Sequence, residues 1–433
     1  MKKWFEPIDN APLVIFRMLF GFLLFAESIG AICTGWVYRV FLQPEFTFSH
    51  IGLDWLQPLP GFGMYVYFVV MGLFGLMIML GYRYRLGLGL FTLMWAGVYF
   101  MQKESYNNHY YLLLLVCVIM WFQPANRYAS LDAKRNPAIK TNRMPRWCSL
   151  VMIFQISIVY VFAVLSKLYP QWLNGEYIKL LLMTNETGVF VKGLFDQHWF
   201  HLFISWSGLA FDLLIIPALL WKRSRTIAFV GALFFHLFNA IVLQIGIFPF
   251  FALAFVLFFY PPEKVRHLFF RNKNNSPEVF PQETYSRSIL YFFIPYFILQ
   301  LGLPLRHHLI KGDVLWTEEG HRLSWRMMLR QKGGYVVYRI VDQKTGETSF
   351  YDLAKRLTTK QQGFAATKPD GIWQLSQRIK KEYAAKGQQV SVYVQALVSV
   401  NGGPLRSLID PKIDMAAAEW DYFGHNDWIL LYE

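Results

Sequence analysis

The stretch from Cys148 to Lys167, CSLVMIFQISIVYVFAVLSK, decides the fold of this chain. It has no charged residue before Lys167, and its few Ser, Gln and Tyr side chains are scattered among apolar ones. A helix needs about 20 largely apolar residues to cross the hydrocarbon core of a membrane. The stretch therefore predicts a membrane-spanning helix that ends at a lysine.

The composition of the whole chain agrees with a membrane protein. Of its 433 residues, 55% are hydrophobic and only 16% are charged, whereas soluble domains have about 25% charged residues. The net charge is nevertheless +14. A nucleic-acid binder needs an exposed basic surface but has no use for long apolar runs. We therefore expect membrane lipid, and no nucleic acid, as the surroundings of this protein.

The three cysteines are too few for a disulfide framework. Cys33, Cys117 and Cys148 each lie in or at the edge of an apolar run, and we expect all three to be small buried side chains. No Cys-x-x-Cys or His-Glu-x-x-His spacing is present, so no metal site is predicted.

About eight or nine stretches are long and apolar enough to be spanning helices. The eighth is the weakest, because it follows the seventh through Gly246–Pro249 with almost no polar loop. These two stretches can also be a helix and a re-entrant segment. The nine candidate spans are residues 11–33, 62–82, 86–102, 110–126, 148–166, 199–221, 226–245, 246–262 and 289–304.

The basic residues of the loops predict the orientation, because Lys and Arg of short loops gather on the cytoplasmic side. With nine spans and the N-terminus inside, the inner loops hold 18 Lys and Arg residues and the outer loops hold five. We therefore expect a cytoplasmic N-terminus and a C-terminal domain in the periplasm or lumen.

The composition changes after Pro304, since residues 305–433 contain 18 Lys and Arg, 14 Asp and Glu, and no long apolar run. Alternation and turn signals predict regular structure there. The expected elements are a hairpin (Tyr335–Ile340 with Thr348–Tyr351), a helix near 370–386 and a strand (Val390–Val400). We predict an α-helical integral membrane bundle at residues 1–304 and a small α+β extracytoplasmic domain at 305–433.

Polar side chains in or beside a span are costly and are therefore functional candidates. They occur at Tyr106–His109, at Ser166–Lys167, at His236 with Asn239 and Gln244, and at His307–His308. The predicted topology places His109 and Lys167 at the same outer membrane face. His198, His201 and Asp212, near the sixth span, have weaker claims. Arg17 and Glu27 are each expected to have a partner on another helix.

Two interpretations of Lys167 are open at this point. Burial disfavours the charged ammonium, so Lys167 can supply a neutral amine that acts as a base. Alternatively, Lys167 extends to the membrane interface and His109 is only a rim residue. For His236 with Asn239, a hydrogen bond between helices and a ligand site are both compatible with the sequence.

The sequence resembles the vitamin K-dependent γ-glutamyl carboxylase family over nearly its whole length. No single motif is diagnostic, but the ordered set is specific. The residues that carry the resemblance are Pro12–Gly21, Asn107–Leu112, Gln155–Tyr160 with Lys167, Leu168 and Trp172, Phe235–Asn239, Gln244–Phe248, Leu303–Pro304 with His307, Ser324–Met328, and Asp410–Asp414 with Trp420.

The resemblance implies an enzyme that couples oxygenation and epoxidation of a reduced naphthoquinone to γ-carboxylation of a protein glutamate. The expected cofactor is reduced vitamin K, a menaquinol- or phylloquinol-type hydroquinone, with O2 and CO2 as co-substrates and a glutamate-containing protein or peptide as partner. Lys167 matches the family base, and His109 matches the residue that stabilises anionic intermediates. Cofactor contacts are implied for Asn108, His236 and Asn239, and substrate contacts for His307, Trp325, Met327 and Met328.

Two departures from the animal members restrict this comparison. Animal enzymes have two adjacent lysines where this chain has Ser166–Lys167, and they continue well beyond the point that matches Glu433. The chain is thus similar to short, bacterial-type members, for which menaquinol and the bacterial inner membrane are expected. A quinol epoxidase or oxygenase without carboxylation is an alternative. A membrane transporter or lipid-binding sensor is another, which the one-sided clustering of polar candidates disfavours.

Overall fold

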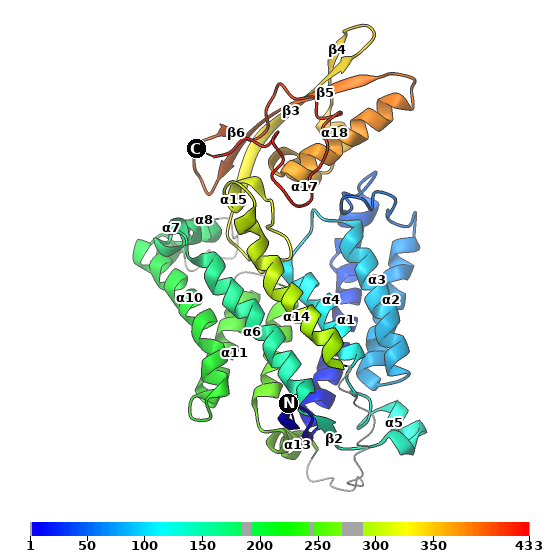
Figure 1. Cartoon of the computed structure of the whole chain (residues 1–433), viewed down its shortest axis with the longest axis vertical. Coiled ribbons are helices and arrows are strands. Elements are labelled where there is room, and N and C mark those ends of the chain that lie inside the picture. The colour runs from blue at the N-terminus through cyan, green and yellow to red at the C-terminus, as the bar shows by residue number, and fades with distance from the viewer. Residues whose placement is uncertain (1, 184–191, 242–245, 271–288, 433) are drawn as a thin grey trace.

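The structure is a computed structural model that describes residues 2–183, 192–241, 246–270 and 289–432 (Figure 1). The long helices stand side by side as a bundle, and a β-sheet with its own helices lies beyond one end of that bundle. We call the part up to Leu305 the helical region and the part after it the C-terminal region.

The helical region is built from long helices joined by short elements. The main helices are α1 (Ala11–Cys33), α2 (Gly63–Leu80), α3 (Tyr84–Met101), α4 (Asn108–Trp121), α6 (Trp147–Lys167), α8 (Glu176–Met183), α10 (His198–Leu220), α11 (Arg225–Ile241), α12 (Phe248–Phe255), α13 (Pro262–Phe270) and α14 (Ile289–Leu305). The short elements are η1 (Lys2–Trp4), β1 (Pro7–Asp9), η2 (Tyr38–Leu42), α5 (Leu131–Arg135), η3 (Pro137–Ile139), β2 (Arg143–Pro145), α7 (Pro170–Leu173), α9 (Lys192–Phe195) and η5 (Val256–Phe259).

Within the described residues, five helices are long and apolar enough to cross a membrane, or six with a bent pair counted as one span. The bent pair, Phe248–Phe259 with Pro262–Phe270, turns by 115° and is a broken span or a re-entrant loop. The predicted count of eight or nine full spans is not confirmed. One reason is length, since the 14 residues of α4 rise only about 21 Å, less than the hydrocarbon core of about 30 Å.

Close helix contact explains two glycines of the apolar sequence. Gly21 of α1 lies against α2, where a Cβ atom would come within 2.3 Å of the Met79 backbone nitrogen. Gly75 of α2 lies against Phe25 in the same way, at 2.7 Å from its backbone nitrogen. Small residues at such crossings let two membrane helices approach closely.

Both charged residues of α1 have partners, but only Glu27 has the partner on another helix that the sequence predicted, whereas Arg17 binds a loop. Glu27 accepts a hydrogen bond of 2.9 Å from the Tyr110 hydroxyl of α4. Arg17 is fully buried and donates to the carbonyl oxygen of Ala125 at 3.2 Å, in the loop after α4. The prediction for the cysteines was right for Cys117 and Cys148 but wrong for Cys33, which is exposed because it is the last residue of α1, at the edge of the bundle.

The C-terminal region contains one sheet and several short helices. Its elements are η6 (Arg306–Leu309), α15 (Val314–Thr317), β3 (Lys332–Asp342), β4 (Thr348–Phe350), α16 (Leu353–Arg356), α17 (Thr359–Thr367), α18 (Pro369–Ala384), β5 (Val390–Val400) and β6 (Arg406–Ser407). The helix near 370–386 and the strand at 390–400 confirm the sequence prediction.

The sheet is antiparallel with the strand order β4-β3-β5-β6. The predicted hairpin forms between β3 and β4, but β3 pairs along its full length with β5, from Lys332 opposite Val400 to Asp342 opposite Val390. Alternate residues of β5 are buried, as expected for a strand with one covered face. Val392 and Val394 there pack with Leu375 of α18 in a second core, separate from the core of the bundle.

Buried polar contacts hold the C-terminal region against the helical region. Asp370 of α18 forms ion pairs of 2.7 Å with Lys103, in the loop after α3, and with Arg322. Gln361 of α17 donates a hydrogen bond of 2.6 Å to the Phe46 carbonyl oxygen. The two regions therefore meet at the end of the bundle where α3 ends and α4 begins.

Candidate functional site

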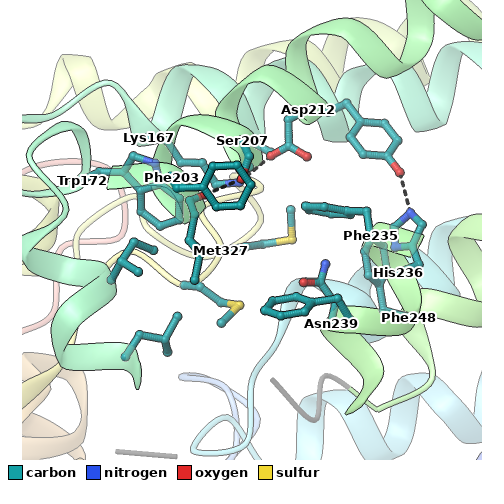
Figure 2. Close-up of a pocket in the computed structure, with 18 of the residues that line it drawn as sticks. Lys167, Trp172, Phe203, Ser207, Asp212, Phe235, His236, Asn239, Phe248 and Met327 are labelled. Carbon is teal, nitrogen blue, oxygen red and sulfur yellow. Dashed lines mark hydrogen bonds and ion pairs between the residues drawn. The ribbon is translucent and has the colours of Figure 1, made fainter. Parts of the chain in front are cut away.

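A cavity of about 460 Å³ lies inside the helical region, among α6, α8, α10, α11 and α12. Most of its lining is aromatic or aliphatic. The polar residues that line it are His109, Tyr160, Lys167, Ser207, Asp212, His236 and Asn239. In Figure 2, Lys167 and Trp172 lie at one end, His236, Asn239 and Phe248 lie at the other, and Asp212 and Met327 lie between them. We call this space the apolar cavity.

Lys167 is the last residue of α6, and its position follows from the local sequence. The helix stops at Leu168, and Pro170, which has no amide hydrogen to donate, opens the next short helix. The Lys167 Nζ atom forms an ion pair with the Asp212 carboxylate of α10 and lies 5.0 Å from the centre of the Trp172 ring. Lys167 is 9% exposed and Asp212 is 7% exposed, so the pair is buried.

Asp212 is the functional candidate that the sequence underrated. It is the only acid in the stretch 199–221, and a lone acid in an apolar span needs a partner at the same depth. It also shares one face of α10 with the buried His201 and Ser205. These two signals, taken with a lysine at the end of α6, could have predicted the pair.

The opposite end of the apolar cavity is formed by two histidines. The His236 Nε2 atom is 3.2 Å from the Tyr160 hydroxyl of α6, which is the interhelical hydrogen bond that the sequence left open. The His109 ring stacks on Phe248 with ring centres 4.2 Å apart and planes at 15°. Asn239, 8% exposed, lines the same cavity one turn after His236.

Asn107 determines where His109 lies. It caps α4, since its Oδ1 atom accepts a hydrogen bond of 2.8 Å from the Tyr110 backbone nitrogen. This cap places His109 in the first turn of the helix, where it faces Phe248 of α12.

The side chain of Asn108 does not line the apolar cavity. Its side chain accepts a hydrogen bond of 2.9 Å from the Tyr106 hydroxyl and donates one of 3.0 Å to the Arg326 carbonyl oxygen. It lines a second cavity of about 210 Å³, which lies toward the C-terminal region. We call this second space the polar cavity.

The polar and apolar cavities share a wall made of His109, Met327 and Met328. Met327 and Met328 belong to a strained connection, because the non-glycine residues Leu323, Trp325 and Met328 have positive φ angles of 60°, 55° and 51°. Such angles cost free energy and persist only when the surrounding structure enforces them. The connection therefore holds the two methionines between the cavities.

The other two predicted substrate contacts lie outside both cavities. Trp325 is completely buried, with its ring centre 5.0 Å from that of Tyr111. The His307 Nδ1 atom is 2.8 Å from the Pro304 carbonyl oxygen, and its Nε2 atom is 3.4 Å from the Arg326 guanidinium. His307 thus reaches the polar cavity only through Arg326, which lines it. Gln244 lies outside the described residues.

The polar cavity is rich in charge, and most of this charge is paired. Its cations are Lys103, Arg322, Arg326, Arg330 and Lys368, and its acids are Glu104 and Glu318. Burial alone would raise the pKa of Glu318, yet Arg330, Lys332 and Lys368 hold it well below its usual range. Burial lowers the pKa of Lys368 to about 7, although Glu318 opposes this shift from 2.7 Å away.

The arrangement brings an apolar space with a buried base candidate next to a cationic space that suits an anion. Among the described residues, no group of three or more His, Cys, Asp and Glu side chains is placed to hold a metal ion.

Comparison with known proteins assigns both regions. Residues 5–263 match the family described as the HTTM domain, so the helical region with its apolar cavity belongs to the HTTM class of membrane proteins. Residues 285–433 match the family described as the vitamin K-dependent gamma-carboxylase lumenal domain. Together these matches show that the chain belongs to the vitamin K-dependent γ-glutamyl carboxylase family, as its sequence motifs indicated.

Family membership indicates an extracytoplasmic C-terminal region and implies vitamin K hydroquinone as cofactor. No solved structure matches this chain.

Proposed function

We propose that this protein is a membrane γ-glutamyl carboxylase that couples epoxidation of a reduced naphthoquinone to carboxylation of glutamate with CO2. The observation that carries the proposal is the shared wall of His109, Met327 and Met328. An apolar compound and an anionic one can approach this wall from its two sides without entering each other's surroundings.

The apolar cavity fits a hydroquinone head group. Its volume of about 460 Å³ is typical of small-molecule sites, which span roughly 300–1,000 Å³. A hydroquinone has oxygens on opposite sides of its ring, and polar groups stand at both ends of the cavity, with Lys167 at one end and His236 and Asn239 at the other. Phe203 and Phe234 line the cavity and are also 60% and 70% exposed, so a lipid tail can extend between α10 and α11.

No side chain can remove a γ-proton of glutamate at neutral pH, so the strong base must come from the bound hydroquinone. The hydroquinone and O2 together supply that strong base when they are bound. The chain supplies the rest. In its neutral form the Lys167 amine accepts a hydroxyl proton and becomes the ammonium that pairs with Asp212, which fixes its position. The aromatic walls exclude the water that would quench a strong base.

The polar cavity suits the glutamate side chain. Arg326 is the clearest candidate for its carboxylate, because Asn108 binds only the Arg326 backbone and the guanidinium faces His307 rather than a buried acid. Met327 and Met328 then separate the glutamate from the apolar cavity, and His109 contacts both spaces.

The remaining predictions from the sequence enter this proposal unchanged. We infer a membrane domain at residues 1–304 and an extracytoplasmic domain at 305–433, with the N-terminus in the cytoplasm. We also infer a menaquinol-type lipid and a bacterial inner membrane, as expected for the short members that the sequence resembles.

The test uses purified full-length protein with hydroquinone, O2, ¹⁴CO2 and a glutamate peptide. We expect Lys167→Ala to abolish both epoxide formation and incorporation of label, whereas Lys179→Ala, which changes an exposed lysine on α8, retains both. Normal epoxidation by the Lys167→Ala protein would refute the role of this residue. Epoxide formation by wild-type protein without carboxylation of any glutamate peptide would instead favour a quinol epoxidase.

A further inference from the structure

The proposed reaction leaves one proton over in each turnover, and this inference rests on that proposed function. At the glutamate, a carbon–hydrogen bond breaks, a carbon–carbon bond to CO2 forms, and one carboxylate becomes two with release of one proton. The hydroquinone and O2 give the epoxide and one water, which uses both hydroquinone hydrogens. One proton must therefore leave a site that is closed to bulk water.

The apolar cavity offers no evident exit. Among the described residues that line it, the ionisable side chains are His109, Tyr160, Lys167, Asp212 and His236, and the other walls are largely hydrocarbon. A proton needs polar groups or water on its way. The polar cavity beyond His109 has room for several water molecules, at about 30 Å³ each.

Glu104 lies in the loop between α3 and α4 and lines the polar cavity. Its Oε2 atom is buried and has no hydrogen-bond partner among the described residues. The adjacent Ser105 hydroxyl binds the Nζ atom of Lys360, an exposed residue of α17. Figure 1 shows α17 above the ends of α3 and α4. Glu104 is therefore situated between the cavity and the water-facing surface.

Burial holds the pKa of His321, which also lines the polar cavity, well below its usual range. The charged groups of this cavity other than Glu104 have fixed partners or keep their protons. Lys103 is held by Asp370, and Lys368 is held by Glu318, both at 2.7 Å. Glu318 is surrounded by cations, and the arginines keep their protons. Glu104 forms no ion pair within 4.0 Å in the described residues. It is free to change its protonation state without breaking a salt bridge.

The electrostatic surroundings of Glu104 also favour a change in its protonation state. Burial raises the pKa of Glu104 to about 7, and the positive charge of Lys360 on α17 lowers it by a smaller amount. Arg39, at η2, is a further cation near Lys360. A carboxyl group with a pKa near the working pH transfers protons in both directions most effectively.

We propose that Glu104 is the proton-transfer residue that carries the product proton from the polar cavity to water at the extracytoplasmic surface beside α17. It does not touch the hydroquinone and acts after the carbon–carbon bond has formed. Loss of Glu104 therefore slows carboxylation and spares epoxidation, because only carboxylation releases a net proton.

The experiment compares Glu104→Gln, Glu104→Asp and Glu45→Gln in full-length protein, the last as a control at an exposed carboxylate outside both cavities. We expect Glu104→Gln to lower kcat of carboxylation by about a hundredfold, with the peptide KM and the epoxide formed without peptide both unchanged. Glu104→Asp restores carboxylation at least in part, and Glu45→Gln behaves as wild type.

Two results would overturn the inference. One is wild-type carboxylation by the Glu104→Gln protein, and the other is an equal loss of epoxidation and carboxylation, which would make Glu104 a structural residue. Failure of the proposed function gives a different result, since wild-type protein itself would then form no carboxylated peptide.

Discussion

Lys167 of α6 and Asp212 of α10 form a buried ion pair in the wall of the apolar cavity. They carry opposite charges side by side in an otherwise largely apolar lining, so each is the counter-charge of the other. Removal of one partner of a buried pair leaves an unpaired charge and costs about 3–5 kcal/mol, whereas replacement of both by apolar residues is often neutral.

This pair predicts a non-additive result for stability. We expect Asp212→Leu alone to lower the thermal unfolding midpoint of the detergent-solubilised protein. The double variant with Lys167→Met should recover most of that loss, because neither charge of the pair remains. A double variant whose midpoint falls by the sum of the two single losses would show that the residues do not interact.

The same pair predicts an effect on catalysis. Asp212→Asn keeps a side chain that can hold the Lys167 amine by a hydrogen bond, whereas Asp212→Ala leaves the amine without a partner. We expect kcat to fall by about tenfold for the first and by about a hundredfold for the second, with the peptide KM unchanged. Rates of epoxide formation measure this, and equal activity of the two variants would contradict the positioning role.

The stacking of His109 on Phe248 predicts that loss of the Phe248 ring selectively lowers activity with the hydroquinone. Phe248→Leu removes the flat surface at 4.2 Å on which the imidazole lies, at a smaller packing cost than alanine would have. We expect a lower kcat/KM for the hydroquinone. Phe250→Leu is the matched control, since Phe250 is 49% exposed on the same helix, and it should leave kcat/KM unchanged. Identical kinetics of the two variants would exclude a role for the stack.

The contacts of Asp370 predict how the two regions respond to acid. Burial alone would raise the pKa of Asp370, but Arg322 and Lys103 hold it below its usual range. A carboxyl group with a lowered pKa stabilises the folded state above its unfolded pKa of about 3.9, and this stability is lost as the pH falls further. We therefore expect Asp370→Asn to lower the unfolding midpoint by the same amount at pH 5 and pH 8, and by less below about pH 4.

The Asp370 measurement has an internal control. Asp352→Asn changes a half-exposed carboxylate that pairs only with its helix neighbour Lys355, and it should have little effect at any pH. A difference between wild type and Asp370→Asn that grows as the pH falls would contradict the ion-pair interpretation.

The sequence predicted local elements well because their signals are local. The alternation of Val390–Val400 and the apolar run that ends at Lys167 both reappear as β5 and α6. The pairing of β3 with β5 joins residues 48 or more positions apart, and no periodicity records such a partner. The predicted number of spans is not confirmed, and one reason is that apolar composition does not distinguish a crossing helix from the bent α12–α13 pair.

In the candidate site too, local sequence signals could be predicted, whereas contacts that depend on the tertiary fold could not. Lys167 and His109 were predicted as candidates because polar residues stand out in apolar runs, and both line the apolar cavity together with His236 and Asn239. Asn108 and His307 lie outside it because their contacts with Arg326 depend on the tertiary fold. Glu104 was not predicted at all, since an acid in a loop is ordinary until burial and a neighbouring cavity make it unusual.

Glu104 also predicts a stability change that needs no enzymatic assay. Its pKa is raised from 4.5 to about 7 in the folded protein. The folded state therefore retains the proton longer than the unfolded state, and stability falls as the pH rises from about 4.5 to about 7. Glutamine cannot ionise, so Glu104→Gln removes this loss. We expect the unfolding midpoint of the variant, relative to wild type, to rise between pH 5 and pH 8, while that of Glu45→Gln stays level. A constant difference across this range would show that Glu104 is ionised throughout, and such a carboxylate could not accept and release a proton near neutral pH.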